Sequence, residues 1–371
     1  MKIYINKYFK DNRLEKYLDF EYEVYSRSGI NETEKRLIKK LPGLKEPKKI
    51  LILENRTGVI GMIANDLFPE AEVTVQNVDK FHSDKIRHNL KHNEVSDVKV
   101  LCEADVSGKY DAIYYQQTQA NLVKEFVLDL VQQCHTALKK GGKLFLAMEK
   151  KEKVITEKMQ QLFGGATIDN LTEKGLLLIG KKKNNPVEHV DYRADFIFST
   201  KEGGKIAFRS YPGVFAHHRI DEGAKAMLEL VEVNDGDTLL DMGCGMGSIG
   251  IALALQKNLD KIYFVDSNCR AIKATEYNCR NNNIKNYETV LSASGYLIPK
   301  KVKVFTGNPP YFSDYRIAGI FVETACDNLL KGGKAWFVTR NPQRLKEIMT
   351  EKFGNCQLIK HHGYNILVAE R

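Results

Sequence analysis

The segment TLLDMGCGMGSIG, residues 238–250, joins an apolar strand to a loop that carries glycine at every second position. Asp241 stands near the end of the predicted strand. The glycines that follow it let the backbone turn sharply and approach a ligand without Cβ clashes: Gly243, Gly245 and Gly247. In a parallel α/β sheet such a loop lies at the carboxyl edge of the strands, where ligands bind.

A carboxylate at the end of the next strand supports this prediction. The segment KIYFVD ends in Asp266, the usual position for a carboxylate that accepts hydrogen bonds from the two ribose hydroxyls of a nucleoside. The glycines fit the pattern DxGxGxG better than the dinucleotide pattern GxGxxG, and no lysine follows to hold a triphosphate. S-adenosylmethionine therefore fits the loop best, with Asp241 as the candidate to orient its ammonium group.

The same order of strand, loop and helical segments occurs earlier in the chain, about 190 residues before this one. Residues 50–61, ILILENRTGVIG, correspond to the glycine-loop segment, and VTVQNVD ends in Asp79 as KIYFVD ends in Asp266. Residues 138–150, LKKGGKLFLAMEK, correspond to 329–341, LLKGGKAWFVTRN, and each is predicted as a helix stopped by glycine and followed by a buried strand. The halves are therefore predicted to be tandem duplicates.

Strands that alternate with helical segments predict two doubly wound, Rossmann-like α/β domains. We expect the domains to span 1–185 and 186–371, with the division near KKKNNPVEH, and residues 190–210 to form a hairpin. The N-terminal loop ENRTGVIG keeps glycine only at Gly58 before the helix, and YYQQTQAN at 114–121 has no proline. We therefore expect a degenerate first domain that serves as a scaffold.

Two consecutive prolines follow another predicted strand in VFTGNPPYFSDY, residues 304–315. Pro309 and Pro310 can neither continue a helix nor donate to a ladder, so they fix a rigid, extended exit from the strand. We expect the Asn308 side chain and the Pro309 carbonyl to accept hydrogen bonds from a planar exocyclic amine, with the Tyr311 ring against the base or amide that carries it. Such a grip helps localise the nitrogen lone pair and directs it at a sulfonium methyl group.

Composition limits the other possibilities. The chain has 371 residues, of which 43% are hydrophobic, and a net charge of +9, which is compatible with nucleic-acid docking without requiring it. Seven cysteines without a CxxC pair argue against a disulfide framework or a zinc site, and HHGY at 361–364 has no third ligand at metal spacing. The sequence contains no long apolar run and no signal-peptide core, so we expect a cytoplasmic protein without a metal.

The NPPY motif after a glycine-loop sheet resembles the amino methyltransferases of the class I S-adenosylmethionine fold. The second half is similar to the bacterial ribosomal RNA guanine-N2 methyltransferases of the RsmC/RlmG type. This resemblance rests on three further segments: SYPGVFAHHRIDEGAKAMLEL, KGGKAWFVTRNPQRL and FGNCQLIKHHGYNILVAER. It implies methylation of a guanine N2 amine in ribosomal RNA, of the small subunit rather than the large, with S-adenosylmethionine as cofactor and ribosomal RNA or a ribosomal subunit as partner. It also implies no membrane association and a degenerate N-terminal copy that assists RNA binding.

The chain departs from that family at two points. The family commonly has Phe and then His after NPP, whereas this chain has Tyr311 and Phe312. The family's residue near the adenine of the cofactor should fall around LSASGY, where Ser292 and Ser294 stand, and Ser294 is our candidate. The predicted catalytic residues are Asn308, Pro309, Pro310 and Tyr311. The predicted cofactor-binding residues are Asp241, Gly243, Cys244, Gly245, Gly247, Asp266, Ser267, Ser294 and Asn308.

Three other functions remain open from the sequence. The NPPY motif also occurs in methyltransferases that act on adenine N6 or on glutamine N5 of a release factor, although the latter carry a small helical N-terminal domain. A non-catalytic RNA-binding assembly factor is the alternative outside enzymes. His217, His218 and Arg219 are candidates for contact with the cofactor carboxylate or RNA phosphate, and the lysine runs at 39–40, 48–49 and 181–183 for a phosphate-binding surface, although solvated faces are as common.

Overall fold

A computed structural model of the chain describes most of its residues. They are residues 12–17, 20–26, 29–118, 123–172, 175–184, 187–200, 204–295, 298–310 and 315–371. The chain divides into two compact units, and the division falls between Tyr192 and Arg193. Among the described residues, no helix has the length and apolar character needed to cross a membrane.

The division lies later than the expected boundary at 185 because the segment before it packs on the N-terminal unit. The Gln132 side chain donates to the Val190 carbonyl at 2.9 Å and accepts from the Val190 N–H at 2.8 Å. The Lys158 ammonium lies 6.0 Å from the centre of the Tyr192 ring. These contacts hold residues 187–192 against the N-terminal unit.

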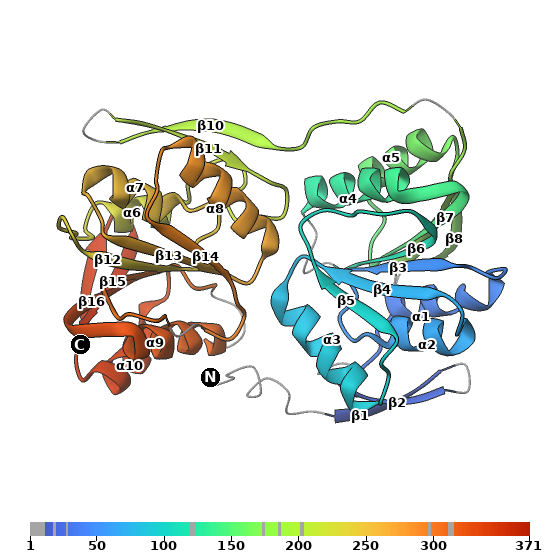
Figure 1. Cartoon of the computed structure of the whole chain (residues 1–371), viewed down its shortest axis with the longest axis horizontal. Coiled ribbons are helices and arrows are strands. Elements are labelled where there is room, and N and C mark those ends of the chain that lie inside the picture. Colours follow the sequence, from blue (N-terminus) through green and yellow to red (C-terminus); the bar gives the residue numbers. More distant parts are fainter. Residues whose placement is uncertain are drawn as a thin grey trace. The chain divides into compact units, whose positions relative to one another are not determined.

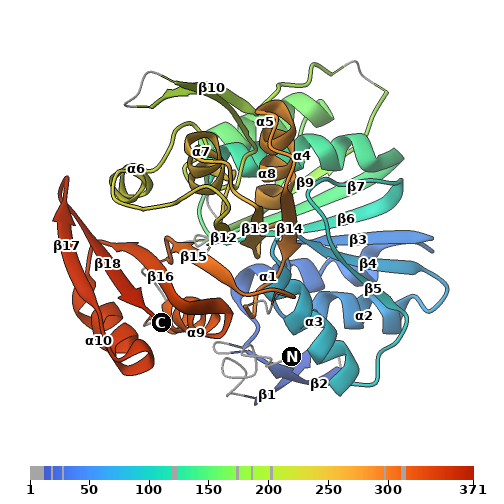
Figure 2. The same ribbon diagram turned by 60° about the vertical axis from the view of Figure 1, so that its left-hand side comes forward.

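The C-terminal unit is built on one seven-stranded sheet with the order β14-β13-β12-β15-β16-β18-β17. Its strands are β12 Thr238–Met242, β13 Lys261–Asp266, β14 Tyr287–Leu291, β15 Val302–Gly307, β16 Leu329–Thr339, β17 Gln357–His361 and β18 Tyr364–Glu370. The first five strands of that order run parallel, and β18 pairs antiparallel with both β16 and β17. Figure 2 shows β18 and β17 continuing the sheet beyond β16.

Helices cover both faces of this sheet. They are α6 Glu222–Leu228, α7 Ser248–Gln256, α8 Cys269–Asn281, α9 Arg316–Asn328 and α10 Pro342–Phe353. Figure 1 shows α6, α7 and α8 on one face and α9 and α10 on the other. The central strands β12 and β13 are buried almost throughout, which explains their continuous apolar sequences. The predicted doubly wound fold is therefore confirmed in this unit.

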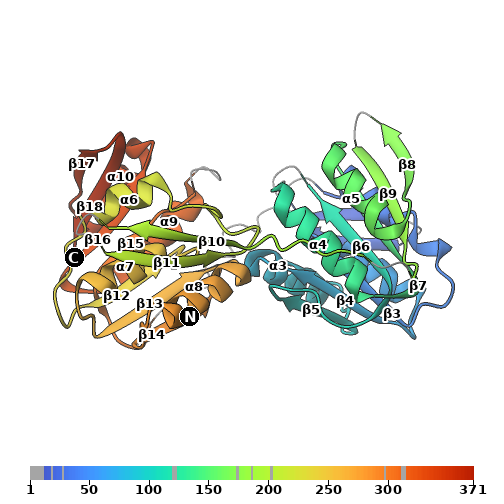
Figure 3. The same ribbon diagram turned by 90° about the horizontal axis from the view of Figure 1, so that it is seen from above.

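The predicted hairpin at the start of the C-terminal unit is also confirmed. Strands β10 Ala194–Ser199 and β11 Lys205–Ser210 pair antiparallel, and the turn residues 201–203 lie outside the described part of the chain. Figure 3 shows the hairpin over the helical layer, and the Asn278 side chain of α8 fixes it by donating to the Arg209 carbonyl at 2.9 Å.

The N-terminal unit repeats this architecture, with the sheet order β5-β4-β3-β6-β7-β9-β8. Its strands are β3 Lys49–Leu53, β4 Glu72–Asn77, β5 Val98–Cys102, β6 Tyr110–Gln117, β7 Leu138–Met148, β8 Thr167–Thr172 and β9 Gly175–Lys181. Its helices are α1 Glu32–Ile38, α2 Val59–Leu67, α3 Lys80–His92, α4 Lys124–Ala137 and α5 Lys153–Phe163, with a 3-10 turn η2 at Leu41–Gly43. A separate hairpin of β1 Asn12–Tyr17 and β2 Phe20–Tyr25 precedes them. The identical strand order confirms the predicted duplication.

The glycine pairs at 141–142 and 332–333 do not stop helices, contrary to the sequence prediction. Helix α4 ends at Ala137 and β7 begins at the next residue, and α9 and β16 join in the same way. The register of β15 and β16 shifts between Val302 and Val304, and Gly332 there has a φ of 72°. The glycines therefore lie within an irregular part of each strand, a position that a helix-stop pattern does not reveal.

Gly250 sets the distance between α7 and the sheet. A Cβ at this position would lie 2.4 Å from a ring atom of the fully buried Phe264. The corresponding Gly61 of α2 faces the Val75 side chain at 2.7 Å by the same measure. Each unit thus keeps a glycine where the first helix approaches the sheet most closely.

We predict that Gly250→Ala lowers the free energy of unfolding of the C-terminal unit by about 1–3 kcal/mol, because the added methyl overpacks a core that has no room for it. Gly319→Ala in α9 is the control, since no heavy atom of the described residues lies within 4 Å of its Cβ position. Urea unfolding followed by the fluorescence of Trp336, the one tryptophan of the chain, reports this unit selectively. Equal midpoints for Gly250→Ala and wild type would contradict the packing argument.

Candidate functional site

The glycine loop lies between β12 and α7, at the carboxyl edge of the sheet. The strand order reverses there, because β12 pairs with β13 on one side and with β15 on the other. Such a switch point is where open α/β sheets bind ligands. All three glycines have left-handed backbone conformations, with φ of 70° at Gly243, 58° at Gly245 and 81° at Gly247. The loop therefore requires the residues that the sequence pattern singled out.

Asp266 braces this loop from the end of β13. Its Oδ2 accepts a hydrogen bond from the Gly245 N–H at 2.9 Å, and its Oδ1 accepts from the Asn268 N–H at 2.8 Å. The residue is only half-buried. Each carboxylate oxygen can accept a further hydrogen bond, so the group can bind a ligand hydroxyl while it holds the loop.

Cys244 has a packing role. The residue is buried, its Sγ lies 3.5 Å from the Thr275 Oγ1, and burial raises the pKa of its thiol well above the ordinary value. Because a thiol must ionise to act as a nucleophile, the structure favours packing as the role of this small side chain. The Thr275 hydroxyl also donates to the Gly245 carbonyl at 3.0 Å, which ties the loop to α8.

Asp241 is a buried residue of β12 that hydrogen-bonds to two neighbouring elements of the site. It is 1% exposed, its Oδ1 accepts from the Thr306 hydroxyl of β15 at 2.9 Å, and its Oδ2 accepts from the Gly250 N–H of α7 at 3.1 Å. Burial raises the pKa of Asp241 to about 6 against the two hydrogen bonds that lower it. The sequence predicted contact with a ligand ammonium group, but the structure favours a role in joining β12, β15 and α7.

Asn308 lies directly beyond β15 and points its amide at the start of α6. Its Nδ2 donates to Asp221 Oδ2 at 3.1 Å, and the same oxygen accepts from the Ala224 N–H at 3.1 Å, so Asp221 is the N-cap of α6. Because a carboxylate oxygen accepts, the amide must turn its Nδ2 toward Asp221 and its Oδ1 away from it. Sequence reasoning missed this pairing, because 87 residues separate the two side chains.

The other predicted residues lie near the same edge of the sheet. Pro309 is buried and Pro310 half-buried directly after Asn308, while Tyr311 and Phe312 lie outside the described residues. Ser267 follows Asp266 and is half-buried.

The turn that contains Ser294 is fixed beside the end of β13. The Ser292 N–H donates to the Asp266 carbonyl at 2.9 Å, and the Ser292 hydroxyl donates to the Gly295 carbonyl at 2.7 Å. Half-buried Ser294 lies between these two anchored residues. The structure thus brings it to the edge where the sequence expected it.

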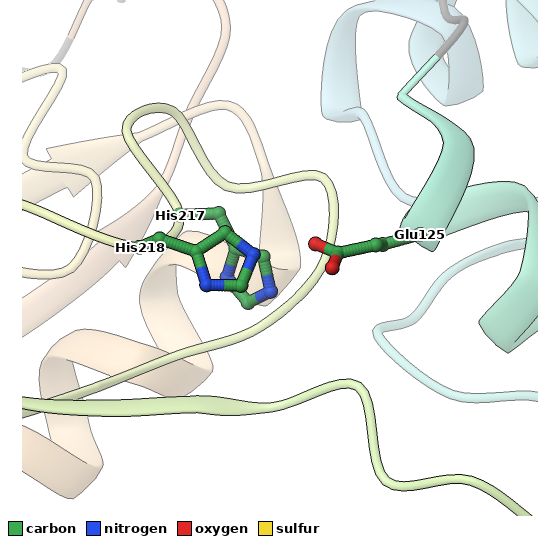
Figure 4. Close-up of side chains that lie close together, drawn as sticks. All are labelled: Glu125, His217 and His218. Atoms are coloured by element: carbon green, nitrogen blue, oxygen red, sulfur yellow. The ribbon is translucent and has the colours of Figure 1, made fainter.

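The loop between β11 and α6 carries His217 and His218, whose ring centres lie 4.4 Å apart. Figure 4 shows both rings extending from this loop, and it also draws Glu125 of α4 from the N-terminal unit. The start of the loop is tied to α8, because Asn268 Nδ2 donates to the Gly213 carbonyl at 2.9 Å. His217 is buried and His218 is exposed.

The N-terminal unit has a different set of residues at the same edge of its sheet. The counterpart of Asp266 at the end of β13 is Asn77 at the end of β4. Asp79 instead caps α3 by accepting from the Phe81 N–H at 2.8 Å. The sequence pairing of Asp79 with Asp266 was therefore wrong by two positions, because an N-cap Asp and a strand-end Asp look alike in a sequence.

Gln116 takes the position of Asn308 in the N-terminal unit. Its Nε2 donates to Asn31 Oδ1 at 3.0 Å, and Asn31 is the N-cap of α1. The link between strand end and helix cap is thus present in both units, but it contains a carboxylate only in the C-terminal one.

Glu34 fills the loop region of the N-terminal unit. This buried side chain accepts from Asn55 Nδ2 at 2.8 Å and from the Thr57 hydroxyl at 2.5 Å. Burial raises its pKa. Ala224 holds the equivalent third position of α6, so the C-terminal unit has a methyl group where the N-terminal unit has a carboxylate.

Several lysines considered for a phosphate-binding surface have structural partners. Lys182 Nζ donates to the Leu138 carbonyl at 2.9 Å and Lys183 Nζ to the Gly164 carbonyl at 2.9 Å. Lys40 pairs with Asp169. These contacts stabilise helix ends and surface pairs, so the structure does not favour a phosphate-binding surface formed by them.

Comparison with known proteins decides the family. The sequence model of the methyltransferase small domain family matches residues 18–177 and 205–368, one match in each unit. The chain belongs to this family. The matches confirm that both units are methyltransferase-like domains.

Among curated relatives, the ribosomal RNA small subunit methyltransferase C of Pseudoalteromonas translucida is 34% identical over 173 residues, which are 46% of this chain and 50% of the relative. The protein of the same name from Pseudomonas putida is 25% identical over 266 residues, 70% of this chain and 75% of the relative. For most of the relatives in this group the match spans about half of their length. These relatives support the predicted resemblance to the RsmC type.

A solved structure shares the fold over almost the whole chain. The T. thermophilus 16S rRNA N2 methyltransferase RsmC, in complex with AdoMet and guanosine, has a TM-score of 0.78 at 19% identity and covers 98% of this chain and 99% of its own. At this identity the likeness establishes the fold of the two units and no more.

The buried carboxyl of Asp241 should make stability depend on pH. Its pKa rises from 3.8 to about 6 on folding, so the native state binds more protons between these values and stability falls as the pH rises through them. Asp241→Asn removes this titration and keeps both hydrogen bonds, since its Oδ1 accepts from Gly250 and its Nδ2 donates to the Thr306 oxygen. We predict that the urea midpoint of unfolding, followed by Trp336 fluorescence, decreases less between pH 4 and 6 in Asp241→Asn than in wild type. Parallel pH profiles would contradict the assignment.

Proposed function

We propose that the C-terminal unit transfers a methyl group from S-adenosylmethionine to the exocyclic N2 amine of a guanine in small-subunit ribosomal RNA. Three findings support this proposal. The chain belongs to a methyltransferase family, curated relatives bear the name ribosomal RNA small subunit methyltransferase C, and the RsmC structure of the same fold holds AdoMet and guanosine. The arrangement of Asn308 and Asp221 is the observation in this chain that carries it.

The glycine loop and Asp266 fit the cofactor. The half-buried Asp266 carboxylate, which holds the Gly245 N–H at the end of β13, is the proposed acceptor for the ribose hydroxyls. Among the described residues, no heavy atom lies within 4 Å of the position that a Cβ on Gly245 would take. The backbone at Gly245 therefore has open space beside it, where the aminoacyl end of S-adenosylmethionine can lie.

The Asn308 amide is oriented for an amine substrate. Asp221 holds its Nδ2 end, which leaves Oδ1 as the acceptor for one N–H of the guanine N2 amine, and the Pro309 carbonyl is the proposed acceptor for the other. Asp221 is thus a positioning residue that acts through Asn308. The prediction that the Tyr311 ring stacks on the base falls on a residue outside the described part of the chain.

The chemical step needs no strong base beforehand. The guanine N2 lone pair attacks the sulfonium methyl, a C–N bond forms as the C–S bond breaks, and the bonding electrons leave on sulfur as S-adenosylhomocysteine. The nitrogen becomes acidic only as it is alkylated, and its proton then departs. Oriented acceptors on the two N–H bonds stabilise the developing positive charge, which is catalysis by position and electrostatics.

The N-terminal unit is proposed as a scaffold that docks RNA without binding the cofactor. Glu34, Asn55 and Thr57 form a buried hydrogen-bonded network at its loop. A cofactor there would have to displace this network, and Asn77 offers an amide where Asp266 offers a carboxylate.

Cofactor binding should therefore occur once per chain. We predict that isothermal titration of S-adenosylmethionine gives one site in wild type and that Asp266→Ala abolishes or strongly weakens it, because the ribose hydroxyls lose their acceptor and the loop its brace. Asn77→Ala, at the matching position of the N-terminal unit, is the control and should bind as wild type does. Two equivalents per chain, or loss of binding in Asn77→Ala alone, would contradict the proposed division of roles.

Asn308→Ala should lower the turnover number about 10²–10³-fold, the usual cost of removing one oriented group that stabilises a transition state. The affinity for S-adenosylmethionine should change little. The assay measures methyl transfer to small-subunit RNA or subunits, with the product nucleoside identified by mass spectrometry. Wild-type turnover in the variant would refute the proposed hydrogen bond between the amine and Asn308. N6-methyladenosine as the product would refute guanine as the target base.

A further inference from the structure

Three side chains with metal-binding atoms meet on the surface of the C-terminal unit. His361 Nε2 and His362 Nε2 lie 2.6 Å and 3.1 Å from the same oxygen, Oε2 of Glu229. All three ligand atoms lie within 4.8 Å of one another. We propose that Glu229, His361 and His362 bind a divalent transition-metal ion, with Zn²⁺ as the ion that best fits two imidazoles and a carboxylate.

The β17–β18 turn brings the two histidines to one side. His361 pairs with Tyr364 across a two-residue turn, in which His362 has a φ of 45° and Gly363 a φ of 76°. Positive φ at both central residues is the type I′ geometry, which is rigid and matches the twist of the strands. The histidines therefore do not alternate across the sheet as neighbours on a strand would, and their ring centres lie 4.2 Å apart.

The distances suit a metal after a small adjustment. A tetrahedral ion about 2.0 Å from nitrogen and oxygen ligands separates those ligands by about 3.3 Å. The separations of 2.6 Å and 3.1 Å would have to open by about 0.7 Å and about 0.2 Å to reach that value. The His362 side chain is 63% exposed, so it can move and leaves the fourth position open to water.

Glu229 is electrostatically disposed toward a cation. It is the C-cap of α6, where the helix carbonyls already concentrate partial negative charge. A carboxylate at this end of a helix is unfavourable by itself, and a bound cation offsets both charges. Both Nε2 atoms already lie within hydrogen-bond distance of the same carboxylate oxygen, which keeps the three side chains together.

The proposed ion would strengthen the link between two elements that already pack against each other and are joined by the contacts of Glu229 with the two histidines. Figures 2 and 3 show α6 beside β18, and the ion would fasten the end of α6 to the β17–β18 turn. Because α6 begins at Asp221, the ion would stabilise the same helix that holds Asn308. The site does not depend on the proposed methyl transfer.

The test is a titration of zinc sulfate into the full chain, with His362→Asn, Glu229→Gln and wild type compared. Asn is well tolerated at positive φ, so His362→Asn preserves the turn. Wild type should bind one Zn²⁺ through these residues and gain thermal stability from it. Each variant should bind Zn²⁺ more weakly than wild type does. The loss of affinity should exceed the roughly 10–100-fold that follows from loss of an outer-shell partner.

His92→Asn is the matched control, because His92 Nε2 also contacts a glutamate, Glu23, at 2.9 Å, but in the N-terminal unit and not at the proposed site. It should leave the zinc affinity unchanged. The chain also has free cysteines, including the partly exposed Cys102, Cys326 and Cys356, and zinc on these would persist in His362→Asn. Equal affinity in wild type and His362→Asn, or no saturable binding by wild type, would overturn the proposal.

Discussion

One oxygen of Asp221 sets the geometry on which the site depends, because it accepts from both the Ala224 N–H and the Asn308 amide. The first hydrogen bond caps the start of α6. The second fixes the Asn308 amide with its Nδ2 toward Asp221 and its Oδ1 away from it. A helix cap thereby defines the direction in which the proposed acceptor, Asn308 Oδ1, points. The N-terminal unit has the same link between Gln116 and Asn31, but there an amide partner fixes no such direction by charge.

The rest of the site is built from carboxylates that each join separate elements. Asp241 connects β15 to α7, and Asp266 connects the end of β13 to the glycine loop. These bonds lie around the switch point of the sheet, where the backbone is least regular and most in need of support. The loop at this edge is held by buried polar groups. Burial disfavours the charged form of Asp241, and the raised pKa of its carboxyl reflects this.

The sequence predicted the features that depend on local pattern, and it failed where distant segments decide. The tandem sheets and the glycine loop follow from periodicity and glycine spacing. The pairing of Asn308 with Asp221 and the third potential metal ligand at Glu229 required the fold, since each joins residues far apart in the chain. Asp79 was misassigned because the residue that caps a helix lies only two positions after the end of the preceding strand. The sheet pairing shows that the strand ends at Asn77 and that Asp79 is the cap.

The most direct test of the central claim is the single-turnover rate of methyl transfer by Asp221→Ser at saturating cofactor and RNA. Serine is a good N-cap, so the helix and cofactor binding should be retained, but its shorter side chain carries no carboxylate to hold the Asn308 amide in one orientation. The account predicts a rate about ten-fold or more below wild type, with an unchanged Trp336 unfolding midpoint. A wild-type rate in this variant would contradict it.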